Sequence, residues 1–177
     1  MLRLEPMTST ASTSARSVRS NPRPTGPDAE ARAAQLRAAN INPRTGLATD
    51  YLNHFNEAIM LLEMIPDMPE CADDFMSWYP LTYAEHFTAS NFKARDLAIE
   101  AYETADAHVR AEFDNITSSM TSILTAVSSA MREVSQDRTR ATLAEQAIVW
   151  VKPLASLAGG IINGGTDADV ETIMAGD

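Results

Sequence analysis

The sequence predicts an all-α fold, a helical bundle with one long central helix at about residues 107–134 and a disordered N-terminal arm. Two observations favour this fold class. Apolar residues recur at gaps of three and four from Val109 to Val134, which keeps one apolar stripe on a helix for more than three heptads. Alanine, methionine, leucine and isoleucine supply most of the 45% apolar content and only 6% is aromatic, a composition that suits helices better than strands.

The central helix determines what the rest of the chain has to do. At 1.5 Å per residue it would be roughly 40 Å long, more than a small core needs unless other helices lie along it. Its polar positions between Asn115 and Ala130 are mostly serines and threonines without charge, whereas a helix surrounded by water usually carries charged residues. We therefore expect both faces to be covered, one by helices at residues 52–65 and 92–102 and the other by the C-terminal segment or a second subunit.

The chain divides by composition into three parts: a disordered arm at residues 1–27, a helical bundle domain at 28–165 and an acidic tail at 166–177. The length is that of one ordinary domain with additional tails. Arginine, serine, threonine and proline dominate the arm, and acidic residues are almost absent from it. This composition is typical of disorder, and an organellar targeting segment is the alternative.

The first half of the bundle domain begins with an alanine-rich helix, expected at residues 28–39, and a turn-rich connector at 40–48. Thr49 is a suitable N-cap for the next helix, and Pro66 ends that helix. Its buried stripe is expected to consist of Leu52, Phe55, Ile59 and Leu62.

Two patterns resemble capping boxes, Asp67 with Glu70 and Thr82 with Glu85. The first predicts a short helix over about residues 68–78, and the second predicts a helix that starts directly after Thr82. A bulky corner between these helices is expected to plug one end of the bundle, and it consists of Trp78, Tyr79, Pro80 and Leu81.

The helix after this corner is expected to break near Ser90 and to resume over residues 92–104. Asp106 is a suitable cap for the central helix. The polar run at 135–140 is either a turn or a solvated helical segment. Helical spacing then returns until Pro153, which kinks or ends the helix.

The charge of the chain is distributed unevenly. Residues 1–44 hold seven arginines against three acidic residues, a net +4, so that a total of −10 leaves −14 for residues 45–177. Such an acidic body would repel the phosphate backbone, and we expect no nucleic-acid binding through the folded part. The sequence has no apolar run of transmembrane length. A single cysteine, Cys71, excludes an intrachain disulfide, and we expect a cytoplasmic location.

Three stretches of residues 47–105 carry a resemblance to known sequences. They are GLATDYLNHFNEAIMLLEMIPDMPEC, W-x-P-L-x-Y-x-E-H-F and NFKARDLAIEAYE. In these stretches the chain resembles a group of small, uncharacterised helical proteins from proteobacteria. The resemblance covers about a third of the chain and implies a genuine helical domain. It brings no activity and no site residues with it.

No cofactor is predicted, and a metal ion is the alternative. Carboxylate-bridged metal centres in helical bundles use Glu-x-x-His pairs, and no such pair occurs in the chain. A metal ion would therefore need a non-standard site, for which the candidate ligands are His54, Glu57, Glu85 and His86. A copper(I) site is a second option, because thioether and thiolate ligands occur close together in the sequence at Met60, Met64, Met68, Cys71 and Met76.

The sequence favours a protein that is not an enzyme. Cys71 lies among acidic residues that raise the pKa of a thiol, and the motifs of serine hydrolases, P-loops and dinucleotide sites are absent from the sequence. We expect a helical protein that acts through protein–protein contacts, as an oligomer or an accessory subunit. A metal-binding bundle and a granule- or surface-coating protein are the alternatives.

The expected interface combines the apolar stripe of the central helix with a small-residue segment near the C-terminus. Small residues spaced by four, as around Gly159 and Gly160, allow a helix to pack closely against another helix or another subunit. The interface candidates are Met120, Ile123, Val127, Met131, Gly159 and Gly160.

Overall fold

A computed structural model describes residues 25–165 of the chain, and residues 1–24 and 166–177 lie outside it. The described part is helical and contains no strand, which confirms the all-α fold class. The predictions of a disordered arm and an acidic tail therefore concern mainly residues outside the described range. The elements in order are α1 Pro27–Ala38, the 3₁₀ helix η1 Thr49–Tyr51, α2 Leu52–Met64, α3 Cys71–Ser77, α4 Tyr83–Ala89, α5 Arg95–Glu103, α6 Ala107–Arg132 and α7 Asp137–Ile162.

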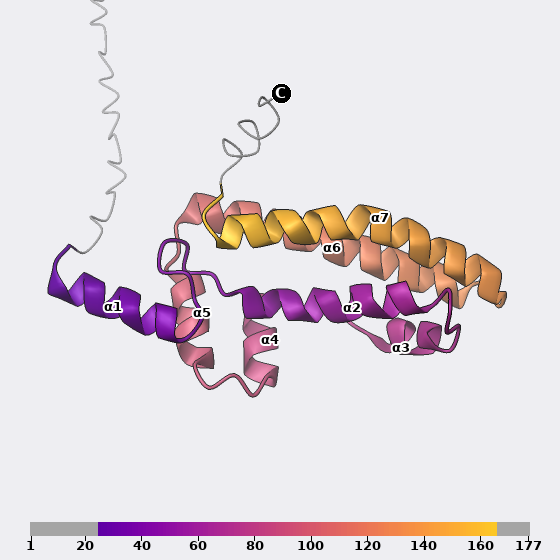
Figure 1. The fold of residues 1–177 in the computed structure, drawn as a ribbon, viewed down its shortest axis with the longest axis horizontal. Helices are drawn as coiled ribbons and strands as arrows, with labels where there is room; N and C mark the ends of the chain where they lie inside the picture. Colours follow the sequence, from indigo (N-terminus) through magenta and orange to yellow (C-terminus); the bar gives the residue numbers. More distant parts are fainter. Residues whose placement is uncertain (1–24, 166–177) are drawn as a thin grey trace, which may run out of the picture.

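The two longest helices, α6 and α7, run side by side and form the frame of the molecule (Figure 1). Helix α2 lies along α7, α3 packs against α2 and α6, and the short helices α4 and α5 stand crosswise to α2. Helix α6 buries mainly large apolar side chains, whereas three of the buried residues of α7 are alanines. The buried apolar residues of α6 are Phe113, Met120, Leu124, Val127 and Met131, and those of α7 include Ala144, Ala147, Val151 and Ala158.

Both ends of α6 are fixed by side chains. The Asp106 carboxylate accepts hydrogen bonds from the backbone N–H groups of His108 and Val109, which confirms the predicted cap. At the other end, Arg140 Nε donates to the carbonyl oxygens of Met131 and Val134 at 3.2 and 3.0 Å. The polar run at 135–140 is thus divided: Ser135 and Gln136 belong to the connection, and Asp137–Arg140 form the first turn of α7, whereas the central helix ends at Arg132.

The predicted cover of α6 is only partly right. Helix α7 takes the main place along α6, whereas α2 packs on α7 instead. The N-terminal half of α6 meets η1 and α4 through aromatic rings, because Tyr51 and Tyr83 lie 6.0 and 6.2 Å from Phe113 between centroids. Within the described chain a row of small polar side chains of α6 stays exposed, namely Ser118, Ser122, Thr125 and Ser129. Cover of this row by a second subunit stays a prediction.

The start of α2 differs from the prediction. Thr49 does not act as its N-cap, because residues Thr49–Tyr51 form a 3₁₀ turn and no side chain caps the helix. The reason lies in Asp50, whose carboxylate is bound to a histidine of α4 and holds this turn in place. The predicted stripe of Leu52, Phe55, Ile59 and Leu62 is buried as expected, and α2 ends before Pro66.

One of the two predicted capping boxes is present. At Thr82 the hydroxyl accepts from the Glu85 N–H at 3.2 Å, and the Glu85 carboxylate accepts from the Thr82 N–H at 2.8 Å. The box at Asp67 is wrong, since α3 begins only at Cys71. Asp67 lies instead in the turn that follows α2, where its own N–H donates to the Met64 carbonyl at 3.1 Å.

The capping box at Thr82 provides a stability prediction. Thr82→Ala is expected to lower the free energy of unfolding by about 1 kcal/mol, because the Glu85 N–H loses its acceptor. Thr88→Ala is a matched control, since the exposed Thr88 hydroxyl donates to the Ala84 carbonyl within the same helix and caps nothing. Urea unfolding of both variants tests this, and an equal loss in the two would refute a special role for the box.

The corner at residues 78–81 is only partly inserted. Trp78 and Leu81 are half-buried, whereas Tyr79 is 67% exposed. Helix α5 starts at Arg95, three residues later than the predicted start at Phe92, after the break at Ser90 that the sequence predicts.

Pro153 does not end the C-terminal helix, because α7 continues through it to Ile162. An interior proline costs a helix about 3 kcal/mol. Val151 before the proline and Ala158 after it are buried, and the packing of α7 on α6 and α2 offsets that cost. The Thr45 hydroxyl also donates to the Ile162 carbonyl at 2.7 Å and ties the end of α7 to the connector before η1.

Among residues 25–165, no helix combines the length and the apolar character that crossing a bilayer would require.

Candidate functional site

His54 is buried on α2, and its ring takes part in local structure. Its Nε2 accepts a hydrogen bond from the Leu81 N–H at 3.0 Å, and its ring stacks on Trp78 with centroids 4.8 Å apart. Burial, and then the neighbouring His86, lowers the pKa of His54 to about 4. The ring is therefore neutral at pH 7, and its acceptor nitrogen holds the corner at residues 78–81 on α2.

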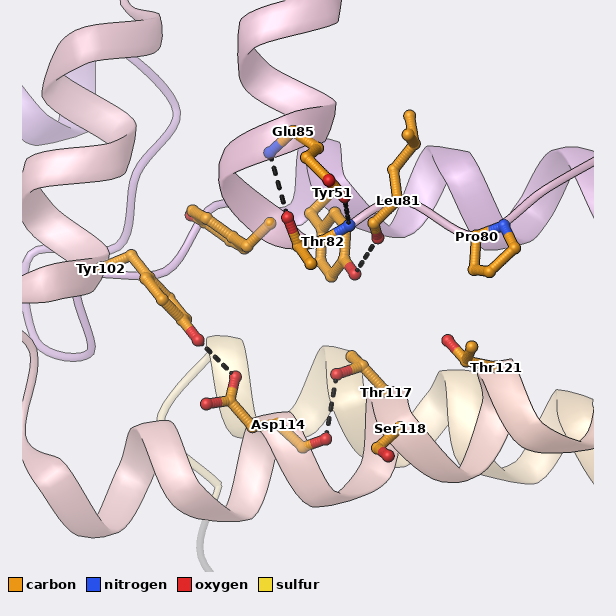
Figure 2. A pocket seen from close by; sticks show the side chains of 11 residues that line it. Tyr51, Pro80, Leu81, Thr82, Glu85, Tyr102, Asp114, Thr117, Ser118 and Thr121 are labelled. Carbon is orange, nitrogen blue, oxygen red and sulfur yellow. Dashed lines mark hydrogen bonds between the residues drawn. The ribbon is translucent and has the colours of Figure 1, made fainter.

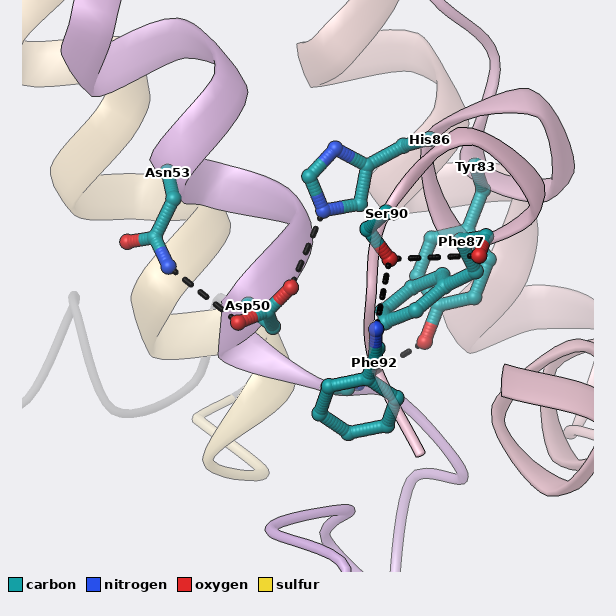
Figure 3. A network of polar contacts seen from close by, with 8 residues as sticks. Asp50, Asn53, Tyr83, His86, Phe87, Ser90 and Phe92 are labelled. Atoms are coloured by element: carbon teal, nitrogen blue, oxygen red, sulfur yellow. Dashed lines mark hydrogen bonds and ion pairs between the residues drawn. The ribbon is translucent and has the colours of Figure 1, made fainter. Parts of the chain in front are cut away.

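His86 on α4 forms the second part of this region (Figure 3). Its Nε2 donates to the Asp50 carboxylate at 3.0 Å, and the other oxygen of Asp50 accepts from the Asn53 side chain at 3.3 Å. A histidine paired with a carboxylate also occurs in hydrolases, where it activates a hydroxyl. The Ser90 hydroxyl drawn beside the pair instead donates to the Phe87 carbonyl and accepts from the Phe92 N–H. The pair thus links η1 to α4.

The four metal-ligand candidates do not come together as a ligand set. His54 gives its lone pair to a backbone amide, Glu85 completes the capping box, and Glu57 is exposed on α2. Throughout residues 25–165, His, Cys, Asp and Glu nowhere form a group of three or more with the placement that a metal ion needs.

The sulfur-containing residues also occupy different environments. Cys71 is buried at the start of α3, and burial, followed by the charges of Glu70 and Asp74, raises the pKa of its thiol. Met60 and Met68 are exposed, whereas Met64 and Met76 pack against the core. Cys71 is thus an inert buried thiol, and two of the four methionines are occupied in core packing.

The buried histidine provides a pH prediction. An unfolded histidine has a pKa near 6.5, so between about pH 6.5 and 4 the unfolded chain binds a proton that folded His54 refuses. The stability contribution of neutral His54 is complete above pH 6.5 and is lost as the pH falls towards 4, by up to about 3 kcal/mol.

Urea unfolding at pH 7, 6 and 5 measures this loss. In His54→Gln the side-chain amide oxygen still accepts from the Leu81 N–H but does not titrate in this range. The variant should therefore show a flatter pH dependence than the natural chain. Equal slopes for the two proteins would contradict the role assigned to His54.

A pocket of about 390 Å³ lies between α6 and the segment at residues 80–85 (Figure 2). Its polar groups are largely paired with each other: Tyr102 donates to Asp114 at 2.6 Å, and Tyr51 donates to the Leu81 carbonyl at 2.7 Å. Burial raises the pKa of Tyr51 and Tyr102 well above the usual range, which keeps both hydroxyls protonated as donors. These pairs hold α5 and the corner on the rest of the fold.

A second, wider hollow of about 630 Å³ lies where the connector, the start of α2 and the end of α7 meet. Asparagines dominate its polar lining. The Asn42 side-chain oxygen accepts from the Arg44 N–H at 2.8 Å, and Asn53 donates to Asp50. Both side chains thus serve the local turns.

The predicted interface residues fall into two groups. Met120, Val127 and Met131 are buried inside the chain itself, and Ile123 is half-buried. Gly159 lies against α2, where a Cβ would stand 3.9 Å from the Leu52 side chain, whereas Gly160 is exposed with open space around it. Of this set, Gly160 alone is exposed to solvent in the described chain.

Sequence reasoning missed the outward side of α7. Val149 and Trp150 are 65% and 53% exposed, and Leu157 is 41% exposed. The residues that share this side at helical spacing are called here the α7 outer face, and they are Thr142, Gln146, Val149, Trp150, Pro153, Leu157 and Gly160. The signal was present in the run from Ile148 to Val151, because four consecutive apolar residues in a helix cannot all point inward.

The comparisons with known proteins assign nothing, since no family model, curated protein or solved structure matches the chain.

Proposed function

We propose that this chain is a non-enzymatic helical protein that acts through protein–protein contact, and that the α7 outer face is the contact surface. The observation that carries the proposal is the exposure of Val149, Trp150 and Leu157 on one side of one helix. Aromatic and aliphatic side chains that are gathered on one surface in this way are typical of interaction sites.

The charge pattern supports the same surface. Between Gln146 and Ile162 the sequence contains a single charged residue, Lys152, in a chain of net charge −10. Lys152 is itself paired, because its Nζ lies 2.6 Å from the Glu63 carboxylate of α2. Charged residues are depleted at the centres of interfaces, and this stretch of α7 is depleted in the same way.

Because α7 is held firmly by its neighbours, the α7 outer face can bind a partner with little rearrangement. Helix α7 is buried on its inner side against α6 and α2, and its end is tied to the connector through Thr45. A surface held in this way loses little conformational entropy on binding. The groups that sequence analysis considered for catalysis or metal binding all have structural partners or are exposed singly, and we infer a role in the cytoplasm as part of an assembly.

The test compares two variants that add the same charge at equally exposed apolar positions. Val149→Glu changes the α7 outer face, and Tyr79→Glu changes the remote corner, where the side chain is 67% exposed. Light scattering across micromolar concentrations and pull-down with the immobilised chain are expected to show an association that Val149→Glu loses and Tyr79→Glu keeps. Two results together would refute the proposal. They are a natural chain that stays monomeric at all concentrations, and a pull-down in which the immobilised natural chain binds no protein that the Val149→Glu variant fails to bind.

A further inference from the structure

Asparagines are gathered around the hollow of about 630 Å³ where the connector, α2 and α7 meet, which is called here the asparagine hollow. Of the seven asparagines among residues 25–165, five line it. They are Asn40 and Asn42 at the start of the connector, Asn53 and Asn56 of α2, and Asn163 at the end of α7. Binding sites for small ligands have volumes of about 300 to 1,000 Å³, so the hollow has the size of such a site.

One of these asparagines is held in a backbone conformation that glycine adopts more easily. Asn40 follows the end of α1 with φ 56°, and it is the one residue other than glycine with a positive φ among residues 25–165. Its N–H donates to the Arg37 carbonyl at 3.0 Å. The next N–H, that of Ile41, donates to the Leu36 carbonyl at 2.9 Å, which completes a Schellman motif. Glycine is the usual residue at this position, and an asparagine there costs stability. The side chain that this cost retains lines the hollow.

The backbone that carries the five asparagines is fixed on three sides of the hollow. The connector is closed by an antiparallel bridge between Ile41 and Ala48. The Thr45 hydroxyl donates to the Ile162 carbonyl at 2.7 Å, which ties the connector to the end of α7. The two asparagines of α2 are three residues apart and therefore lie on the same side of that helix. A site with a preformed backbone loses little conformational entropy on binding.

The amides supply hydrogen-bond donors and acceptors on several sides of the hollow. An asparagine side chain has two N–H donors and one carbonyl acceptor. The bonds within the chain use one atom of Asn42, its oxygen, and one atom of Asn53, its nitrogen. The other three amides are exposed to solvent, and they belong to Asn40, Asn56 and Asn163. A ligand that pairs with both kinds of group in several directions must carry donors and acceptors all around it, as a ring of hydroxyl groups does.

The charged side chains of the hollow are bound within the chain. Arg37 donates to the Glu30 carboxylate at 2.8 Å. The Asp50 carboxylate accepts from His86 at 3.0 Å and from Asn53 at 3.3 Å. The net charge of −10 also repels anions. The hollow therefore suits an uncharged ligand.

Apolar side chains complete the lining. Phe92 is half-buried and lies at the same side of the molecule as Asp50 and Asn53 (Figure 3). The buried apolar residues of the lining are Ile41, Leu52 and Ile162. A sugar carries C–H groups on the faces of its ring and hydroxyl groups around it, so both parts of the lining find a partner on such a molecule.

We propose that the asparagine hollow binds a neutral carbohydrate of one or two sugar units. The asparagine amides pair with its hydroxyl groups, and the apolar side chains cover its C–H faces. The hollow shares no lining residue with the α7 outer face in the described chain, so this site goes beyond the proposed function and does not rest on it. Hydrogen bonds between uncharged groups at an open site are individually weak, and we expect dissociation constants on the order of 1 mM.

NMR spectra of the full chain labelled with ¹⁵N-asparagine test the proposal through the side-chain amide signals. The probes are trehalose, maltose and N-acetylglucosamine, each titrated separately. At least one sugar is expected to shift the signals of Asn40, Asn56 and Asn163 in a saturable manner. The signal of Asn115, which is exposed on α6 and does not line the hollow, should stay constant. Equal shifts of all asparagines, or no saturable shift with any of the three sugars, would overturn the proposal.

The variant Asn40→Gly separates binding from stability. Because glycine suits the positive φ, the variant should be at least as stable as the natural chain in urea. The loss of one amide should weaken the binding of the sugar about three- to tenfold. Unchanged sugar binding by a stable Asn40→Gly chain would show that Asn40 serves only the end of α1, and would overturn the proposal.

Asn56→Ala and Asn115→Ala form a matched pair, since both asparagines are exposed within a helix and alanine favours the helix in both cases. Only Asn56→Ala should weaken sugar binding, and an equal effect of the two variants would contradict the site. The neutral peptide N-acetyl-triglycine amide serves as a further probe. A saturable shift with this peptide and none with the sugars would assign the amides to a peptide main chain and overturn the carbohydrate.

Discussion

Replacement of Phe113 by alanine is expected to destabilise the fold by about 3 to 5 kcal/mol, the usual cost of removing a fully buried phenylalanine. Phe113 is completely buried on α6, and its ring meets those of Tyr51 and Tyr83 at 6.0 and 6.2 Å. It is thus the point at which the long α6–α7 pair contacts η1 and the crosswise helix α4. The cavity left by alanine would loosen all three at once.

Denaturant unfolding measures this loss, with Phe92→Ala as the matched control. Phe92 is only half-buried at the break between α4 and α5, and its ring packs on that of Phe87 with centroids 5.1 Å apart. The control should cost clearly less than Phe113→Ala. A similar cost for both variants would mean that Phe113 does not hold the two parts of the bundle together.

Gly46→Ala is expected to give the second large loss, about 2 to 4 kcal/mol, from two causes that add. The backbone of Gly46 has φ +71°, a conformation that a side chain disfavours, and a Cβ there would lie 2.7 Å from the carbonyl oxygen of Ala101. That oxygen belongs to the backbone of α5, so it cannot rotate away. The connector would have to move off α5.

The control for this variant should change the stability of the fold in the opposite direction. Gly159→Ala adds the same methyl group inside α7, where the nearest side-chain atom, Leu52 Cδ1, is at an ordinary contact distance of 3.9 Å. Because alanine favours a helix over glycine by about 0.5 to 1 kcal/mol, this variant should be slightly more stable than the natural chain. If Gly46→Ala unfolded at the same denaturant concentration as the natural chain, the close approach of the connector to α5 would be wrong.

Local signals in the sequence were sufficient where one side chain decides the outcome. The stripe from Val109 to Val134 and the Asp106 cap predicted α6 nearly to the residue, and Thr82 with Glu85 predicted the start of α4. In each case the deciding hydrogen bonds lie within four residues of each other. Such bonds follow from the sequence without knowledge of the fold.

Features that depend on distant partners were not predictable in this way. Pro153 normally ends a helix, and only the buried contacts of α7 on α6 and α2 explain why the helix continues. Thr49 is a suitable cap by its chemistry, but the bond between Asp50 and His86, 36 residues apart, fixes a 3₁₀ turn there instead.

The candidate site illustrates the same limit. His54 and His86 do lie near each other, with ring centroids 6.0 Å apart, but the sequence could not show that His54 accepts from the backbone of Leu81. The run from Ile148 to Val151 indicates that α7 exposes some apolar residues, but it does not say which of them, because the neighbours that cover the other side of α7 are not known from the sequence. Which apolar residues remain exposed depends on the packing of every helix around them.

Fluorine NMR of the chain labelled with fluorotryptophan tests the central claim most directly, since the chain has two tryptophans and one of them lies on the α7 outer face. The signal of Trp150, assigned with Trp150→Phe, should shift as the concentration rises from the low to the high micromolar range. The signal of Trp78, which bonds the His54 carbonyl and stacks on its ring, should stay constant. A Trp150 signal that does not change over this range while the mass of the particle increases would show that association occurs elsewhere and would contradict the account.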